Sequence, residues 1–166
     1  MQQDDLRLAI HGRHLNARWL RFERKIGISR PVLVLLHEAL GSIALWKDLP
    51  QLLAQACGCD VLVYERFGHG FSDPLPEEAS GFGYLDYEAW QVLPQVLAQC
   101  GIERPVLVGH SDGATLALMY AARYPEKVAG VVSEAAHVFV EEVTLDGIRE
   151  AKRSCAETRL LERLSK

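Results

Sequence analysis

A serine flanked by two glycines is the residue of this chain best suited to covalent chemistry. Gly109-His110-Ser111-Asp112-Gly113 follows an apolar run of strand length and precedes a helix-forming segment. In that setting the pattern Gly-x-Ser-x-Gly is typical of a sharp turn that lifts a serine hydroxyl above a sheet. The glycines leave space where a Cβ would clash, and the start of the helix favours developing negative charge. We therefore expect Ser111 to be a nucleophile, with Gly109 and Gly113 shaping its turn.

A serine nucleophile needs a base to take its proton, and histidine is the usual one. His137 is the only histidine that follows Ser111 in the sequence. It comes shortly after a predicted strand end, and strand ends in α/β sheets face the active site. Ser111, Glu134 and His137 stand in the chain order of a catalytic triad, but Glu134 and His137 are too close to act from separate loops. We expect His137 to line a pocket or a hinge, with a role as the base as the alternative.

The other histidines give weaker signals. His110 precedes the serine in its turn, so its side chain should point away from a substrate and serve packing or hydrogen bonding. His69 lies in a glycine-rich loop and is expected to be exposed or structural. His11 and His14 fall in a predicted hairpin and indicate no chemistry.

The cysteines do not predict a metal site. Cys57 and Cys59 are separated by one glycine, whereas redox pairs and zinc-binding pairs are usually Cys-x-x-Cys. No second Cys or His pair stands at zinc-finger spacing. We expect small packing residues here and no metal ion.

Composition narrows the class of protein further. The chain has 166 residues, of which 49% are hydrophobic and 24% charged, and its formal net charge is −4. These values predict one folded, soluble domain and give no electrostatic reason to expect nucleic-acid binding. The sequence holds no apolar run long enough to cross a bilayer, so no membrane association is expected. Its acidic, polar start is unlike a signal peptide, which favours a cytoplasmic location.

The hydrophobic pattern predicts an α/β fold, with an antiparallel start and then alternating strands and helices. The expected strands are residues 6–10, 14–25, 31–36, 61–64, 105–108 and 128–133. The expected helices are residues 44–56, 84–100 and 112–124, followed by a charged helical segment from Glu141 onward. Continuously apolar strands are typical of a parallel sheet covered on both faces, so we expect helices on both sides of a mostly parallel sheet.

This order of elements, together with three motifs, resembles the α/β-hydrolase fold family over nearly the whole chain. Residues 37–42, His-Glu-Ala-Leu-Gly-Ser, stand where the family has its His-Gly oxyanion loop. Residues 66–73, Arg-Phe-Gly-His-Gly-Phe-Ser-Asp, look like the family's Arg-x-Gly-x-Gly-x-Ser-Asp stretch, and the Ser111 turn completes the set. Residues 134–142 look like the entrance to the cap of carboxylesterase-like and carbon–carbon-bond hydrolase-like members. Glu38 is a departure, because it replaces the glycine of the His-Gly pair.

The resemblance implies a reaction. Ser111 would attack the carbonyl carbon of an ester or related small-molecule acyl substrate, and the backbone N–H groups of Ala39 and Asp112 would hold the oxyanion. His37 would fix the oxyanion loop by hydrogen bonds. Glu38 leaves the N–H of Ala39 in place but adds a carboxylate nearby, unless that side chain points away or is paired. No metal or organic cofactor is implied.

The same resemblance implies that parts of the fold are missing. Family members continue after the cap with two more strands, which typically deliver the acid and the histidine of the triad. We therefore expect an α/β-hydrolase fold lacking its last two strands, with residues 1–136 as the core and 137–166 as the start of the cap. Such a chain would be weak or inactive alone. It could instead be a non-catalytic binding or assembly module, or half of a split enzyme. Self-association or binding of a complementing carboxyl-terminal segment is expected through residues 128–133.

Overall fold

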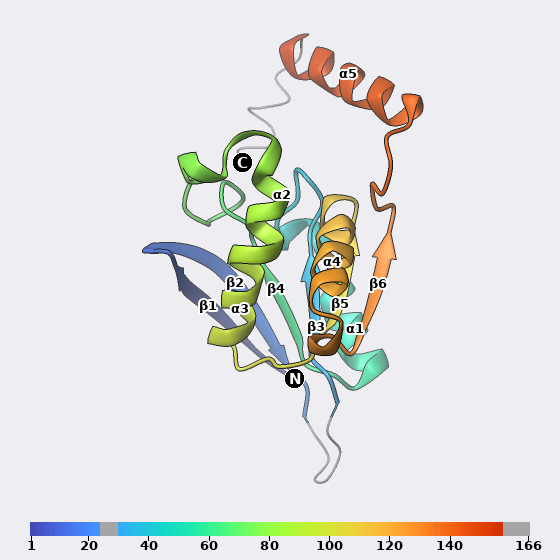
Figure 1. Ribbon diagram of the computed structural model, residues 1–166. Coiled ribbons are helices and arrows are strands. Elements are labelled where there is room, and N and C mark those ends of the chain that lie inside the picture. Colours follow the sequence, from blue (N-terminus) through green and yellow to red (C-terminus); the bar gives the residue numbers. More distant parts are fainter. Residues whose placement is uncertain (24–29, 158–166) are drawn as a thin grey trace. The chain divides into compact units, whose positions relative to one another are not determined.

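A mixed β-sheet forms the centre of the protein. The structure is a computed structural model that describes residues 1–23 and 30–157. Within these residues six strands pair in the order β1-β2-β4-β3-β5-β6 (Figure 1). They are β1 (Gln2–Ile10), β2 (Arg13–Arg21), β3 (Leu33–Leu36), β4 (Val61–Tyr64), β5 (Val106–His110) and β6 (Gly130–Glu134). β3 to β6 are parallel to one another, whereas β1 pairs antiparallel with β2, and β2 with β4. The predicted mostly parallel sheet with an antiparallel start is confirmed.

The first hairpin is longer at its start than the sequence pattern predicts. β1 begins at Gln2 rather than at residue 6, because polar residues there pair across the strands. Arg21 and Asp4 approach to 3.0 Å, and Arg18 and Asp5 to 2.7 Å. The turn consists of His11 and Gly12, both with positive φ, as two-residue hairpin turns require. β2 ends at Arg21, and residues 24 and 25 of the predicted strand lie outside the described residues.

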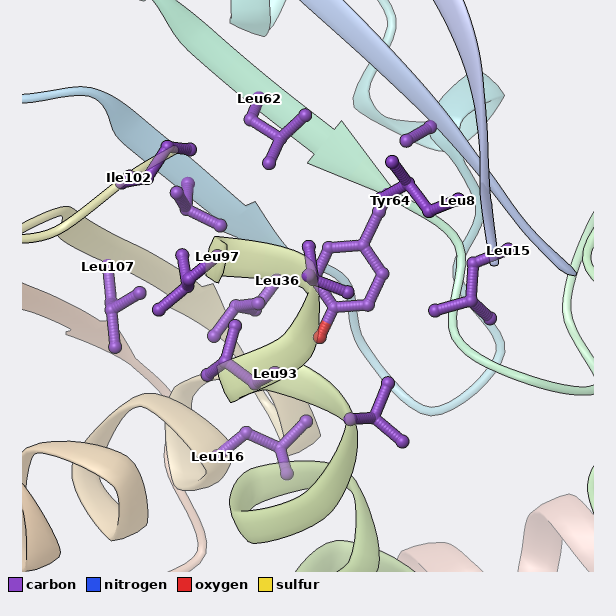
Figure 2. Packing of buried hydrophobic residues seen from close by; sticks show 14 of the residues in the cluster. Leu8, Leu15, Leu36, Leu62, Tyr64, Leu93, Leu97, Ile102, Leu107 and Leu116 are labelled. Atoms are coloured by element: carbon purple, nitrogen blue, oxygen red, sulfur yellow. The ribbon is translucent and has the colours of Figure 1, made fainter. Parts of the chain in front are cut away.

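Helices cover both faces of the sheet, as predicted, and alternate strand residues serve the two sides. On one face Leu36, Leu62 and Leu107 pack against the helices α3 (Leu93–Gln99) and α4 (Asp112–Arg123). Figure 2 shows Leu93 and Leu116 from these helices beside the strand residues. On the other face Leu33, Leu35, Val61 and Val63 pack around Ala54 of the helix α1 (Leu49–Cys57). Burial on both sides explains why these strands are apolar throughout rather than alternating.

Two predicted helices are interrupted. The helix predicted at 44–56 is a 3₁₀ turn, Ile43–Trp46, followed by α1, because Lys47 adopts a φ of 49° between them. The helix predicted at 84–100 is divided into α2 (Tyr84–Tyr87), a π-helical turn (Glu88–Val92) and α3. Pro94 has no N–H for a helical hydrogen bond, and the wider π turn just before it accommodates the ring.

The chain divides into two compact units, residues 1–136 and 137–166. In the first, β6 is the last strand of the sheet, and Val132 in its middle is 54% exposed. In the second, the helix α5 (Glu142–Glu157) exposes Val143 and Ile148. The predicted apolar positions at 160, 161 and 164 lie outside the described residues. In the part of the chain that the structure describes, no helix is long and apolar enough to span a bilayer.

Candidate active site

Ser111 occupies the turn between β5 and α4. Its φ of 52° and ψ of −116° are values that non-glycine residues rarely adopt, and such strain persists only where the surroundings enforce it. One restraint is visible in the backbone, because the Ser111 N–H donates to the Glu134 carbonyl on β6 over 2.8 Å. The carbonyl of Ser111 in turn accepts hydrogen bonds from Ala114 and Thr115 at the start of α4. The serine is therefore fixed between a strand and a helix.

The glycines on either side of the serine are required by contacts with backbone atoms. A Cβ on Gly109 would lie 2.2 Å from the carbonyl oxygen of Gly113. A Cβ on Gly113 would lie 1.9 Å from the carbonyl oxygen of Leu36 on β3. Because the obstacles are backbone atoms, no side-chain rotation could relieve them. The two glycines thus allow the close approach of α4 to the carboxyl ends of β3 and β5.

The loop after β3 lies next to this turn along the sheet, since β3 and β5 are neighbours. The Glu38 carbonyl oxygen accepts hydrogen bonds from the side chain of Arg66 (2.9 Å), the N–H of Gly41 (3.0 Å) and the Nδ1 of His37 (2.7 Å). The Glu38 carboxylate folds back on its own loop and accepts the N–H of Leu40 at 3.3 Å. The carboxylate at this unusual position is therefore engaged within the loop.

His37 is buried and neutral. Its Nε2 accepts the backbone N–H of Arg66 at 3.0 Å, so the ring proton lies on Nδ1 and is donated to Glu38. Burial, and secondarily the Arg66 charge, lower the pKa of His37 to about 3. A neutral ring with both nitrogens engaged serves as a fixed strut between the loops after β3 and β4.

Arg66, Asp112 and Tyr84 form a polar cluster beside the serine turn. The Asp112 carboxylate lies 3.7 Å from a terminal nitrogen of the nearly buried Arg66 guanidinium and accepts the Tyr84 hydroxyl. Burial and the Asp112 carboxylate raise the pKa of Tyr84, which therefore stays protonated and donates. Sequence reasoning did not single out Tyr84, because an isolated tyrosine at the start of a helix carries no motif.

The glycine-rich loop, residues 66–73, packs against and hydrogen-bonds to the side chain of Glu65. This buried carboxylate accepts the backbone N–H groups of Ile43 (3.0 Å) and Phe71 (2.8 Å) and the side-chain amide of Asn16 (2.9 Å). Gly70, with a φ of 52°, packs so tightly on Glu65 that a Cβ there would lie 2.1 Å from the carboxyl carbon. The loop therefore has one defined position against the sheet.

His69 is better connected than its sequence context predicts. Its Nε2 lies 2.7 Å from the carbonyl oxygen of Ala39, and its Nδ1 lies 3.0 Å from that of Phe67. Its ring centre is 4.8 Å from that of His37. His69 thus joins the glycine-rich loop to the loop after β3. The expected structural role is met by specific contacts that no sequence signal indicated.

The remaining predicted residues fall in different places. The N–H groups of Ala39 and Asp112 donate no hydrogen bond within the described residues. His110 ends β5, where it is half-buried and stands opposite Glu134 of β6. His137 is the first residue of the second unit. Among the described residues, no group of three or more His, Cys, Asp or Glu side chains could hold a metal ion.

This chain is similar in sequence and in structure to several known proteins. Residues 31–154 match the sequence profile of the alpha/beta hydrolase fold. An sn-1-specific diacylglycerol lipase of Mus musculus is 34% identical over 61% of this chain and 31% of its own length. A proline iminopeptidase of Lactobacillus delbrueckii is 30% identical over 69% of this chain and 39% of its own. The crystal structure of an alpha/beta hydrolase from Novosphingobium aromaticivorans superposes with a TM-score of 0.65 at 30% identity, covering 78% of this chain and 42% of that one. The chain therefore spans about a third of the length of these curated relatives.

Proposed function

Because the chain belongs to the alpha/beta hydrolase fold family, we propose that it carries the nucleophile and oxyanion hole of a serine hydrolase that cleaves a carboxylic ester or related acyl substrate. One observation carries the proposal. The strained Ser111 turn follows β5, the loop that carries Ala39 follows the neighbouring strand β3, and the N–H groups of Ala39 and Asp112 donate to nothing in the described part of the chain. A serine next to fixed, unused donors is the arrangement that acyl transfer needs.

In the proposed reaction the Ser111 oxygen bonds to the substrate carbonyl carbon while a base takes the hydroxyl proton. The carbonyl electron pair moves to its oxygen, and the resulting oxyanion accepts hydrogen bonds from Ala39 and Asp112. Collapse of this intermediate expels the leaving group and leaves an acyl-enzyme for water to cleave. Backbone donors suit this task because they are oriented before the reaction begins.

The proposed reaction also needs a base and an acid partner for Ser111. His137 is the candidate within this chain, as the first residue of the second unit. The chain covers only 31% of the length of the lipase and 39% of the length of the iminopeptidase. We therefore favour an acid and a base that come from the part of the fold corresponding to the relatives' unmatched length. Residues 137–166 would then begin the cap. A cytoplasmic location remains a prediction from the acidic start of the chain.

Reaction with a fluorophosphonate probe tests the proposal, because such probes label activated serines. Because an oxyanion hole alone supports only a residual rate, we expect mass spectrometry to find slow labelling of Ser111, and Ser111→Ala to abolish it. Ser133→Ala, on the exposed end of β6, is the matched control and should label normally. No labelling of the wild-type chain, either alone or with an added carboxyl-terminal polypeptide, would refute an activated serine and favour a non-catalytic module.

Catalytic turnover of an ester by the isolated chain is a separate prediction from labelling of Ser111. With the triad base and acid unassigned in this chain, we expect little or no hydrolysis of a small activated ester. Measured turnover that disappears in Ser111→Ala and falls sharply in His137→Ala would contradict this expectation and make His137 the base. Turnover that appears only after a carboxyl-terminal polypeptide is added would support a split enzyme.

A further inference from the structure

The direction of the Ala39 N–H is set by the atoms that hold the opposite end of its peptide group. The Glu38 carbonyl and the Ala39 N–H belong to one planar peptide, and no described peptide bond is cis. In a trans peptide the C=O and N–H bonds point in opposite directions. Any group that fixes the Glu38 carbonyl oxygen therefore aims the Ala39 N–H.

That carbonyl oxygen is held by three donors, and one of them is unlike the others. His37 and Gly41 belong to the same loop as Glu38, and the His37 ring is itself held by the backbone N–H of Arg66. The Arg66 side chain reaches the carbonyl oxygen at 2.9 Å from the loop after β4. Of the three donors, Arg66 alone comes from outside the loop that carries Glu38, and it alone carries a charge. Its charge also polarises the peptide, which strengthens the N–H as a donor.

The peptide that follows Ala39 is held in the same way. The Ala39 carbonyl oxygen lies 2.7 Å from Nε2 of His69, which comes from the glycine-rich loop. A carbonyl oxygen only accepts, so a hydrogen bond at this contact requires the ring proton on Nε2. Both peptide groups flanking Ala39 are thus anchored to the loop after β4.

Arg66 also faces the second proposed donor. A terminal nitrogen of its guanidinium is 3.7 Å from the carboxylate of Asp112, the residue after the nucleophile. The side chain is 4% exposed, so the contact lies away from water. One buried cation therefore connects the loop that carries Ala39 with the turn that carries Asp112.

We propose that Arg66 and His69 are positioning residues that aim the Ala39 N–H at the developing oxyanion by holding the carbonyl groups on either side of it. The inference rests on the proposed function for its catalytic meaning, but the contacts can be tested without it. Neither side chain takes part in bond making. They hold the Ala39 peptide groups before the reaction, and their effect on the rate appears when the oxyanion forms.

Two substitutions of His69 separate this role from general support of the loop. His69→Gln places an amide donor near the Nε2 position, where it reaches the Ala39 carbonyl. His69→Asn places it near the Nδ1 position, where it reaches the Phe67 carbonyl within the glycine-rich loop. Loss of one oxyanion donor lowers rates by about 10²–10³-fold, so a misdirected donor should lower them by about tenfold or more. We expect the fluorophosphonate labelling rate of Ser111 to stay near wild type in His69→Gln and to fall by about tenfold in His69→Asn.

Arg66→Lys supplies a second test with its own control. Lysine keeps the charge but cannot contact Glu38 and Asp112 together as the guanidinium fork does. We expect labelling of Ser111 to slow while the protein stays folded by circular dichroism. Arg104→Lys is the control, because Arg104 also donates to a backbone carbonyl, that of Val128 at 3.3 Å. It should label at the wild-type rate.

A spectroscopic readout makes the result independent of reactivity. In isotope-labelled protein the carbonyl carbon and amide resonances of Ala39 should match wild type in His69→Gln and move in His69→Asn. An unreactive wild-type chain would refute the proposed function, and the resonances would still decide the contact. Equal labelling rates of the two His69 variants, or, in an unreactive chain, equal Ala39 resonances, would overturn the inference.

Discussion

Adding one side-chain carbon at Gly113 should damage folding and not only reactivity. The Cβ of an alanine at this position would lie 1.9 Å from the Leu36 carbonyl oxygen, 2.4 Å from the Leu36 carbonyl carbon and 2.8 Å from the His37 carbonyl oxygen. Contacts below 3.0 Å are not found for real Cβ atoms, so α4 and β3 must separate by about an ångström to admit the group. This separation would open the core on the face of the sheet that α4 covers.

The size of the effect follows from overpacking, which lowers the free energy of unfolding by about 1–3 kcal/mol. Gly113→Val should lie at the upper end, near 3 kcal/mol, because the branched side chain adds two methyl groups to the same clash. Gly113→Ala should lose at least about 1 kcal/mol. In a domain of this size about 3 kcal/mol lowers Tm by roughly 6–12 °C.

Urea unfolding followed by circular dichroism measures these changes through the midpoint concentration at constant slope. Gly83→Ala is the matched control, because Gly83 has a φ of −90° and a Cβ there would meet nothing within 4 Å. That variant should be as stable as wild type or slightly more so. A Gly113→Val protein with the wild-type midpoint would refute the close packing of α4 on β3.

Three further predictions follow from strain, charge and the sheet edge. Ser111→Gly should have a free energy of unfolding about 1 kcal/mol higher than Ser111→Ala, because only glycine relieves the positive φ. Equal urea midpoints of the two variants would show that the turn is unstrained. Burial raises the pKa of Glu88 from 4.5 to about 7. The stability of the wild type relative to Glu88→Gln should therefore be greatest below about pH 4.5 and fall as the pH rises through 7. A difference in urea midpoint between the two proteins that does not change with pH would contradict this. The exposed edge of β6 should cause self-association, which sedimentation over a range of concentrations would detect and Val132→Lys should reduce; a wild-type chain that stays monomeric at all concentrations would disprove it.

The sequence predicted the sheet because its signals are strong and local. Short, continuously apolar segments such as β4 are typical of strands covered on both sides, and β4 was predicted to the residue. The interruptions at Lys47 and in the π turn before Pro94 were missed, because a single positive φ or one widened turn leaves no mark on a hydrophobic pattern. Polar residues of β1 were missed because cross-strand ion pairs, rather than burial, hold them.

The serine turn was predicted from its motif, whereas the network around it could not be. Gly-x-Ser-x-Gly specifies its own backbone geometry, so five consecutive residues carry the whole signal. The contacts of Arg66 with Glu38 and Asp112, and of His69 with Ala39, join residues 28 to 46 positions apart. Such contacts depend on how the loops after parallel strands meet in space. Spacing along the chain does not encode them.

The central claim is that Ser111 is a nucleophile served by two backbone donors, and a structure of the fluorophosphonate adduct tests it most directly. We predict phosphorus bonded to the Ser111 hydroxyl oxygen, with the phosphoryl oxygen about 2.7–3.1 Å from the nitrogens of both Ala39 and Asp112. An adduct on Ser111 whose phosphoryl oxygen faces away from these two N–H groups would contradict the account. So would an adduct on any other residue.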